Sequence, residues 1–262
     1  MRNYRLKNMV KNRFPSVFYA LKWLFIREIR IERRLLVKGQ RVVRSGPFLG
    51  MKLPISAYCS KQLPKMVGCY ELELQEWLEA EIVRCPKSII DIGCAEGYYA
   101  AGLAMRCPNA KVIAYDESQV AMDLCSQAAV LNNVQNNISI RGRFVADDLK
   151  HLELDDSLVI CDVEGFESEI FTFSSLKYLK RVNLLIECHD VQTPHVSTEL
   201  LNLFADTHDI QITAQLPRDV KKYARELKIS KNDSRIAVNE GRIVDSIPVG
   251  QIWLYLTSLY KT

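Results

Sequence analysis

The sequence has few of the residues that mark disordered, fibrous or disulfide-bonded chains. Its 262 residues include only 11 Gly and 9 Pro, whereas 48% are hydrophobic and 25% are charged, as in a globular protein with ample material for a core. The eight cysteines are scattered, with no Cys-x-x-Cys pair and no Cys/His cluster at zinc spacing. Disordered, collagen-like and low-complexity classes are therefore excluded, and the cysteine pattern favours a reducing cytoplasm.

Long hydrophobic runs are also missing. The longest apolar stretch, residues 17–26, is interrupted by Lys22, whereas a membrane-spanning helix needs about 20 apolar residues. Basic residues continue after this stretch without a small-residue cleavage site, so it does not fit a secretory signal peptide. We therefore expect a cytoplasmic protein that keeps its N-terminus, with peripheral attachment to the inner face of the membrane as an option.

The charge is distributed unevenly along the chain. Residues 1–45 contain 13 Lys and Arg but only Glu28 and Glu32, a net charge of +11, so the rest carries about −7 of the overall +4. Residues 16–36 combine basic side chains with apolar ones at helical spacing, which predicts an amphipathic basic helix. Such an arm suits an anionic membrane surface or another polyanionic partner, although many basic helices are simply solvated.

The remaining pattern predicts one large α/β domain. Glycines and prolines break the pattern over residues 37–68, so we place the boundary between an N-terminal extension, 1–68, and a main domain, 69–262. A helix is expected from Tyr70 to Pro86, and the tail 251–258 fits a last strand that could run antiparallel. Between them, apolar strands alternate with helices; strands are expected at 88–92, 111–116, 137–143, 157–162, 182–188 and 209–215, and helices at 97–106, 118–131, 167–178 and 196–206. This order predicts a doubly wound, mostly parallel, Rossmann-like sheet covered on both faces.

A glycine-containing turn follows the first expected strand. The sequence Asp91-Ile-Gly-Cys-Ala-Glu-Gly places small residues at Gly93, Ala95 and Gly97, which lets a ligand approach the backbone. The dinucleotide pattern G-x-G-x-x-G is not met from Gly93, so NAD is disfavoured. The spacing resembles instead the first motif of class I S-adenosylmethionine (SAM) methyltransferases. That resemblance implies that Asp91 faces the cationic end of SAM above this turn.

Acidic residues follow the next two strands. Asp116, or Glu117 as a second choice, ends the second strand, where a carboxylate accepts hydrogen bonds from ribose hydroxyls in the resembling family. Alternatively, Asp116 or Ser118 could cap the following helix. After the third strand, Asp147 or Asp148 is a candidate for the adenine amino group, and a solvated loop is the simpler alternative.

Two further strand ends carry most of the remaining charge. Asp162 and Glu164 follow the fourth strand, and Glu187 and His189 end the fifth. Because parallel neighbours meet at one edge of the sheet, we expect these groups to converge on one pocket.

Together, these motifs resemble the FkbM-like SAM-dependent methyltransferases, many of which methylate hydroxyls of glycans or polyketides. The similarity covers residues 68–215 and is strongest at Asp91–Tyr99, Cys161–Glu167 and Ile186–Asp190. It departs from the family at Ile160, where a Lys is common, and at Ala95-Glu96, where Asn is frequent.

The resulting hypothesis is transfer of a methyl group from SAM to a hydroxyl oxygen of a sugar, glycan or related small molecule. We expect His189 to act as the base, with Asp162, Glu164 or Glu187 orienting it. Alternatively, Asp162, Glu187 and His189 bind Mg²⁺.

Two other classes remain open. One is an RNA methyltransferase, which only the basic arm supports; the acidic strand ends and the lack of an Asn/Asp-Pro-Pro-aromatic motif disfavour nucleic acid. The other is a non-catalytic SAM-fold protein on a membrane surface. The sequence gives no indication of oligomeric state.

Overall fold

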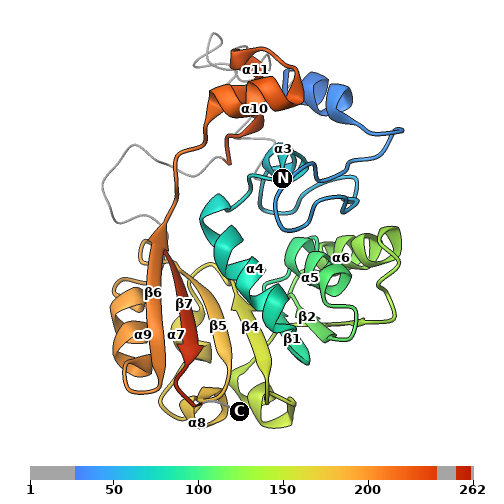
Figure 1. The fold of residues 1–262 in the computed structure, drawn as a ribbon. Coiled ribbons are helices and arrows are strands. Elements are labelled where there is room, and N and C mark those ends of the chain that lie inside the picture. Colours follow the sequence, from blue (N-terminus) through green and yellow to red (C-terminus); the bar gives the residue numbers. More distant parts are fainter. Residues whose placement is uncertain (1–26, 241–251, 261–262) are drawn as a thin grey trace, which may run out of the picture.

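The computed structural model describes residues 27–240 and 252–260 (Figure 1). The apolar stretch 17–26 and most of the predicted basic helix therefore lie outside the described residues; 27–35 are helical as expected. Within the described ranges, no helix combines the length and apolar character needed to cross a membrane.

A seven-stranded sheet forms the centre of the molecule. Its strand order is β3-β2-β1-β4-β5-β7-β6, and β7 alone runs antiparallel to its neighbours. The strands are β1 Ser88–Ile92, β2 Lys111–Tyr115, β3 Ile138–Arg141, β4 Ser157–Cys161, β5 Asn183–Cys188, β6 His208–Ala214 and β7 Ile252–Ser258. The prediction of a doubly wound, mostly parallel sheet of the class I methyltransferase type is confirmed, including the antiparallel last strand. The order reverses between β1 and β4, and this switch point is where ligands bind in such sheets.

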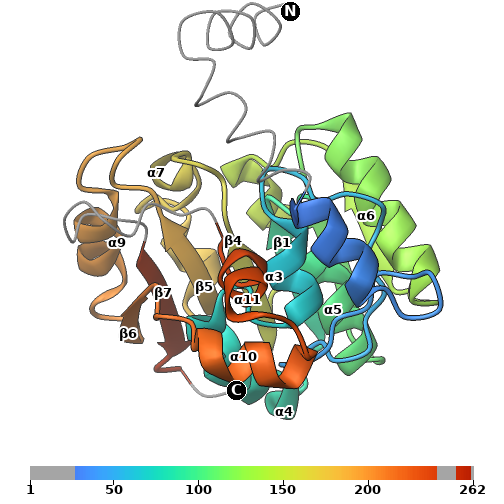
Figure 2. The ribbon, with the colours of Figure 1, turned by 90° about the horizontal axis from the view of Figure 1, so that it is seen from above.

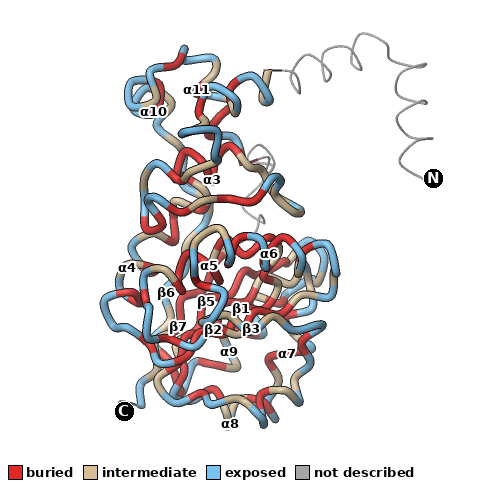
Figure 3. Tube along the Cα trace, turned by 90° about the vertical axis from the view of Figure 1, so that its right-hand side faces the viewer, coloured by how far each residue is buried: buried red, intermediate tan, exposed pale blue. Residues whose placement is uncertain are grey.

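The central strands are buried on both faces, which explains their continuous apolar sequences. Every residue of β1 and β4 is buried. Alternate residues enter two separate cores, so Ile89 packs on one face and Ile90 on the other. Figure 3 shows these buried strands in the middle of the molecule, enclosed by more exposed helices.

Helices cover both faces of the sheet. Residues of α4 (Gln75–Arg84), α5 (Tyr98–Arg106) and α6 (Gln119–Leu131) contribute to the first core. Residues of α7 (Glu167–Ile170), α8 (Leu176–Leu179) and α9 (Val196–Phe204) pack into the second. The short helices η1 (Leu72–Leu74) and η2 (Ala146–His151) precede α4 and β4.

The expected continuous helix 167–178 is wrong. The structure has two single-turn helices, α7 and α8, separated by a turn at residues 171–175. Here Thr172 Oγ1 accepts from the Ser175 amide, and Ser175 Oγ accepts from the Thr172 amide. These side chains replace helical hydrogen bonds, which is the usual reason that Ser and Thr interrupt helices.

A layer of chain that the strand–helix pattern did not predict covers the carboxyl ends of the strands. It contains α3 (Gln62–Val67), α10 (Val220–Leu227), α11 (Lys231–Ala237) and the helix of residues 27–35 (Figures 1 and 2). Arg27 Nε lies 2.8 Å from Asp233 Oδ1, and Arg34 donates to the Lys228 carbonyl at 3.0 Å. Residues 220–238, between β6 and β7, thus pack with the N-terminal extension. The domain division at residue 68 remains a proposal.

Candidate active site

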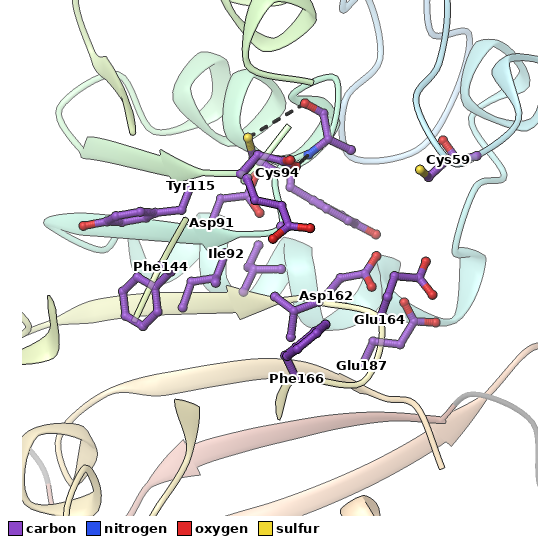
Figure 4. Close-up of a pocket in the computed structure, with 18 of the residues that line it drawn as sticks. Cys59, Asp91, Ile92, Cys94, Tyr115, Phe144, Asp162, Glu164, Phe166 and Glu187 are labelled. Atoms are coloured by element: carbon purple, nitrogen blue, oxygen red, sulfur yellow. Dashed lines mark hydrogen bonds between the residues drawn. The ribbon is translucent and has the colours of Figure 1, made fainter. Parts of the chain in front are cut away.

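A cleft of about 1050 Å³ opens at the switch point. Its floor consists of residues at the carboxyl ends of β1, β2, β4 and β5, and its cover comes from residues 58–70, 214–215 and 240. Figure 4 shows the aromatic side chains of Tyr115 and Phe144 at one end and the carboxylates of Asp162, Glu164 and Glu187 at the other.

The glycine turn after β1 forms the middle of the floor. Gly93 has φ of +86°, and a Cβ there would lie 1.8 Å from the Asp162 carbonyl oxygen. Gly97 has φ of +81° and closely approaches Cys125, while Ala95 adopts a positive φ of 47°. From the sequence alone, Gly93 is expected to leave space for a ligand. The structure adds a different reason, since the backbone after β4 already occupies the position of a side chain.

Asp116 lies beside this turn, as expected from its place at the end of β2. Its Oδ2 accepts from the Ala95 amide at 2.9 Å and its Oδ1 from the Ser118 amide at 2.8 Å. Ser118 caps α6, which was one of the two capping alternatives. The Glu117 side chain is 70% exposed and lies 3.7 Å from Arg143. Asp116 is therefore fixed to the turn, while Glu117 projects to solvent.

Asp147 and Asp148 are not brought into the cleft. Asp147 pairs with Lys150 at 2.6 Å, and Asp148 accepts from the Val145 amide at 2.9 Å. Backbone and apolar groups of residues 144–146 line this end instead, with the Phe144 ring 4.9 Å from the Tyr115 ring.

Asp91 is the most unusual group of the floor. Only 2% of the residue is exposed, and its Oδ2 has no hydrogen-bond partner among the described residues. Burial raises the pKa of Asp91 to about 7, although the Ala100 amide opposes the shift. A buried carboxylate with an unused oxygen at a cleft wall is well placed to bind a cationic ligand group.

At the other end, four predicted residues converge as expected. His189 Nε2 lies 3.5 Å from Asp162 Oδ1, 3.6 Å from Glu164 Oε2 and 4.0 Å from Glu187 Oε2. The three carboxylates line the cleft, whereas His189 is fully buried behind them. A ligand in the cleft therefore contacts the carboxylates before the imidazole.

Glu167 is a member of this cluster that the sequence analysis did not select. Its Oε1 lies 2.5 Å from His189 Nδ1, and neither side chain is exposed. Burial lowers the pKa of His189, but the hydrogen bond with Glu167 and the charge of Asp162 outweigh it and leave the pKa above its usual value. The signal was present in the sequence, since Glu167 is the third acid after β4.

The cover contributes a second group that was missed. Lys65 of α3 forms a buried ion pair with Glu96 in the glycine turn, and Glu96 Oε2 also accepts from the Tyr58 amide at 3.0 Å. Lys65 Nζ lies 4.4 Å from the centre of the Tyr70 ring. The departure from the expected Asn in this turn thus has a structural role, because Glu96 ties the cover to the floor.

Residues 74–161 match the family model of the methyltransferase small domain. This stretch is therefore similar to the methyltransferase small domain, which agrees with the strand order of the sheet. The match covers about a third of the chain and ends at Cys161, the last residue of β4. Asp162, Glu164, Glu187 and His189 lie beyond it.

Two curated relatives match part of the chain. The ribosomal RNA large subunit methyltransferase G of Shewanella amazonensis is 34% identical over 88 residues, covering 32% of this chain and 22% of that protein. The release factor glutamine methyltransferase of Streptococcus pneumoniae is 31% identical over 111 residues, covering 42% of this chain and 38% of that protein. The chain thus spans well under half the length of either relative.

Among solved structures, a putative O-methyltransferase from Klebsiella pneumoniae is similar to 71% of this chain and 80% of its own, with 10% identity and a TM-score of 0.47. The matched proteins act on different acceptors, so they leave the acceptor of this chain open. The more specific likeness to FkbM-like enzymes remains a hypothesis.

Proposed function

We propose that this protein is a SAM-dependent methyltransferase that methylates a hydroxyl oxygen of a sugar, glycan or related small molecule, as FkbM-like enzymes do. The observation that carries the proposal is the two-ended cleft. Its β1 and β2 end has the groups suited to SAM, and its β4 and β5 end has carboxylates suited to binding and deprotonating a hydroxyl.

The residues of the first end fit SAM. The unused Oδ2 of Asp91 suits the cationic amino group, and Asp116 suits the ribose hydroxyls because its two oxygens retain lone pairs. Tyr115 and Phe144 offer apolar surface to the adenine ring. SAM supplies an electrophilic methyl group bound to a sulfonium.

The second end would prepare the acceptor. Methyl transfer is an in-line displacement, so the protein chiefly orients the hydroxyl and takes its proton. Asp162 and Glu187 line the cleft and can accept that proton, while His189 lies behind them. We therefore revise the sequence-based role of His189 from contacting base to a residue that acts through the carboxylates.

Charge at this end favours a neutral polyol over RNA. Three carboxylates, those of Asp162, Glu164 and Glu187, line this end of the cleft, and RNA carries a phosphate charge at every nucleotide. An aromatic side chain, Phe166, also lies at this end, 46% exposed, with the Arg143 guanidinium 5.2 Å from its ring centre. Carboxylates accept hydrogen bonds from several hydroxyls at once, as sugar recognition requires.

The test is methyl transfer from labelled SAM to separate pools of oligosaccharides, RNA and peptides. We expect label only in the sugar pool, stable to mild base as an ether is. The Glu187→Gln variant should bind SAM normally but transfer at least about a hundredfold more slowly, the usual size of a lost proton acceptor. Label in RNA or peptide alone would refute the acceptor class, and absence of SAM binding would refute the enzyme itself.

A further inference from the structure

The imidazole of His189 is held in one orientation from behind. Its Nδ1 pairs with Glu167 Oε1 at 2.5 Å, and the same Oε1 accepts from the Gly165 amide at 3.2 Å. A carboxylate on Nδ1 fixes the ring and directs Nε2 the opposite way. Nε2 therefore faces Asp162, Glu164 and Glu187.

No hydrogen bond reaches His189 Nε2 from the part of the chain that the structure describes. Its nearest carboxylate oxygens lie at 3.5 and 3.6 Å, beyond ordinary hydrogen-bond length. A fully buried nitrogen thus points into a space bordered by carboxylate oxygens without contacting them closely. Such an atom calls for a ligand between them.

The spacing suits a metal ion. Three ligand atoms lie within 4.8 Å of one another, one each from Asp162, Glu164 and His189. Ligands about 2.0–2.2 Å from one ion stand roughly 3–4.4 Å apart, so a small movement of the Glu164 side chain would close the site. Glu164 can move, because its side chain is 62% exposed.

We infer that Asp162, Glu164 and His189 bind a divalent transition-metal cation, with Glu167 orienting His189. A carboxylate on the far nitrogen of a metal-binding histidine is the usual outer partner in such sites. The cation would also offset the charge of the carboxylates gathered around one imidazole.

The donor set indicates which cation. Mg²⁺ and Ca²⁺ favour oxygen-only sites, whereas an imidazole nitrogen with two carboxylates suits Mn²⁺ or Zn²⁺. This differs from the sequence-based alternative in two respects: Glu164 replaces Glu187 as a ligand, and Mn²⁺ or Zn²⁺ replaces Mg²⁺.

The site opens into the cleft, since Asp162 and Glu164 both line it. Resting on the proposed function, the inference gives the cation the role of binding the acceptor hydroxyl and making it more acidic. The hydroxyl proton then passes to Glu187, the oxygen forms its bond to the methyl carbon, and the methyl–sulfur bond breaks with its electron pair on sulfur. Glu187 does not coordinate the cation in this arrangement.

Binding of Mn²⁺ to the full chain tests the site without any acceptor. We expect one Mn²⁺ per chain by electron paramagnetic resonance and calorimetry, and competition by Zn²⁺ but little by Mg²⁺. Asp162→Asn and Glu164→Gln keep the side-chain shapes and should each lower Mn²⁺ affinity by at least about tenfold, and Glu167→Gln by about 10–100-fold. The matched control is Glu169→Gln, a cleft carboxylate outside the cluster, which should bind Mn²⁺ as the wild type does.

The His189→Gln variant lacks a buried imidazole, so circular dichroism checks whether this variant folds. If it does not fold, the Asp162→Asn and Glu164→Gln variants still test the site. No Mn²⁺ or Zn²⁺ binding to the wild type at millimolar concentration, or equal loss in Glu169→Gln, would overturn the site. Methyl transfer that survives EDTA treatment would overturn the role of the cation while leaving the proposed function standing. Mn²⁺ binding without SAM binding would overturn the proposed function while leaving the metal site standing.

Discussion

Replacing Asp91 with Asn should stabilise the cofactor-free protein while weakening its affinity for SAM. Burial raises the pKa of Asp91 from 3.8 to about 7. At a pH between these two pKa values, Asp91 holds a proton in the folded protein that it has lost in the unfolded chain. The contribution of Asp91 to stability therefore declines as the pH rises from about 4 to 7. The full difference of about three pKa units corresponds to at most about 4 kcal/mol.

Urea unfolding in metal-free buffer measures the effect. Between about pH 5 and pH 8 the wild type should lose about 3 kcal/mol more stability than Asp91→Asn, because the amide does not titrate. At pH 8 the variant should therefore be the more stable protein. Equal pH slopes in the two proteins would refute the burial argument.

The SAM affinity should change in the opposite direction. A cationic amino group beside Asp91 favours its charged form, so wild-type SAM binding should release a proton near neutral pH and strengthen as the pH rises toward 8. Asp91→Asn should bind SAM at least tenfold more weakly, about 1.4 kcal/mol, with little pH dependence. The control is Asp147→Asn, because Asp147 is an exposed carboxylate outside the cleft. If Asp91→Asn gains stability without losing SAM affinity, the cofactor binds elsewhere.

Three further expectations concern other parts of the chain. Asp116→Ala should cost about 1.5–3 kcal/mol of SAM binding by calorimetry, whereas Glu117→Ala should be neutral; the reverse result moves the ribose assignment by one residue. Phe166→Ala should raise the KM for a sugar acceptor with little change in SAM affinity, and an unchanged KM would remove the ring from the acceptor site. The full chain should float with anionic liposomes in a salt-sensitive way through its basic segment, and equal flotation of a chain beginning at Arg27 would count against residues 1–26 as the membrane contact.

The sheet and the convergence of its strand ends could be predicted because both follow from local sequence. Strands buried on both faces are continuous apolar runs, such as Ser88–Ile92, and parallel topology brings their carboxyl ends to one edge. Asp91, Asp116 and Asp162 therefore lie where the pattern predicted. The sequence could not show that Asp147 turns away, since this depends on the nearby partner Lys150.

The cover over the cleft could not be predicted in the same way. Helices α10 and α11 are short, and their partners, α3 and residues 27–35, are more than 150 positions away in the chain. Periodicity reports only that a segment has an apolar side, not which distant segment packs against it. The role of Lys65 was hidden for the same reason, because a lysine is expected at the surface until its buried partner Glu96 is known.

The contact between Gly93 and Asp162 relates the two ends of the cleft to each other. Since a Cβ at residue 93 would meet the Asp162 carbonyl, the glycine turn and the first residue after β4 can lie this close only with glycine in the turn. The same close approach fixes the backbone from which the Asp162 carboxylate projects toward His189. The family match includes Gly93 but ends at Cys161, one residue before this carboxylate. The end of the cleft that we propose prepares the acceptor therefore begins where the match to the family model ends. The acceptor has to be inferred from the acid–histidine cluster of this chain itself.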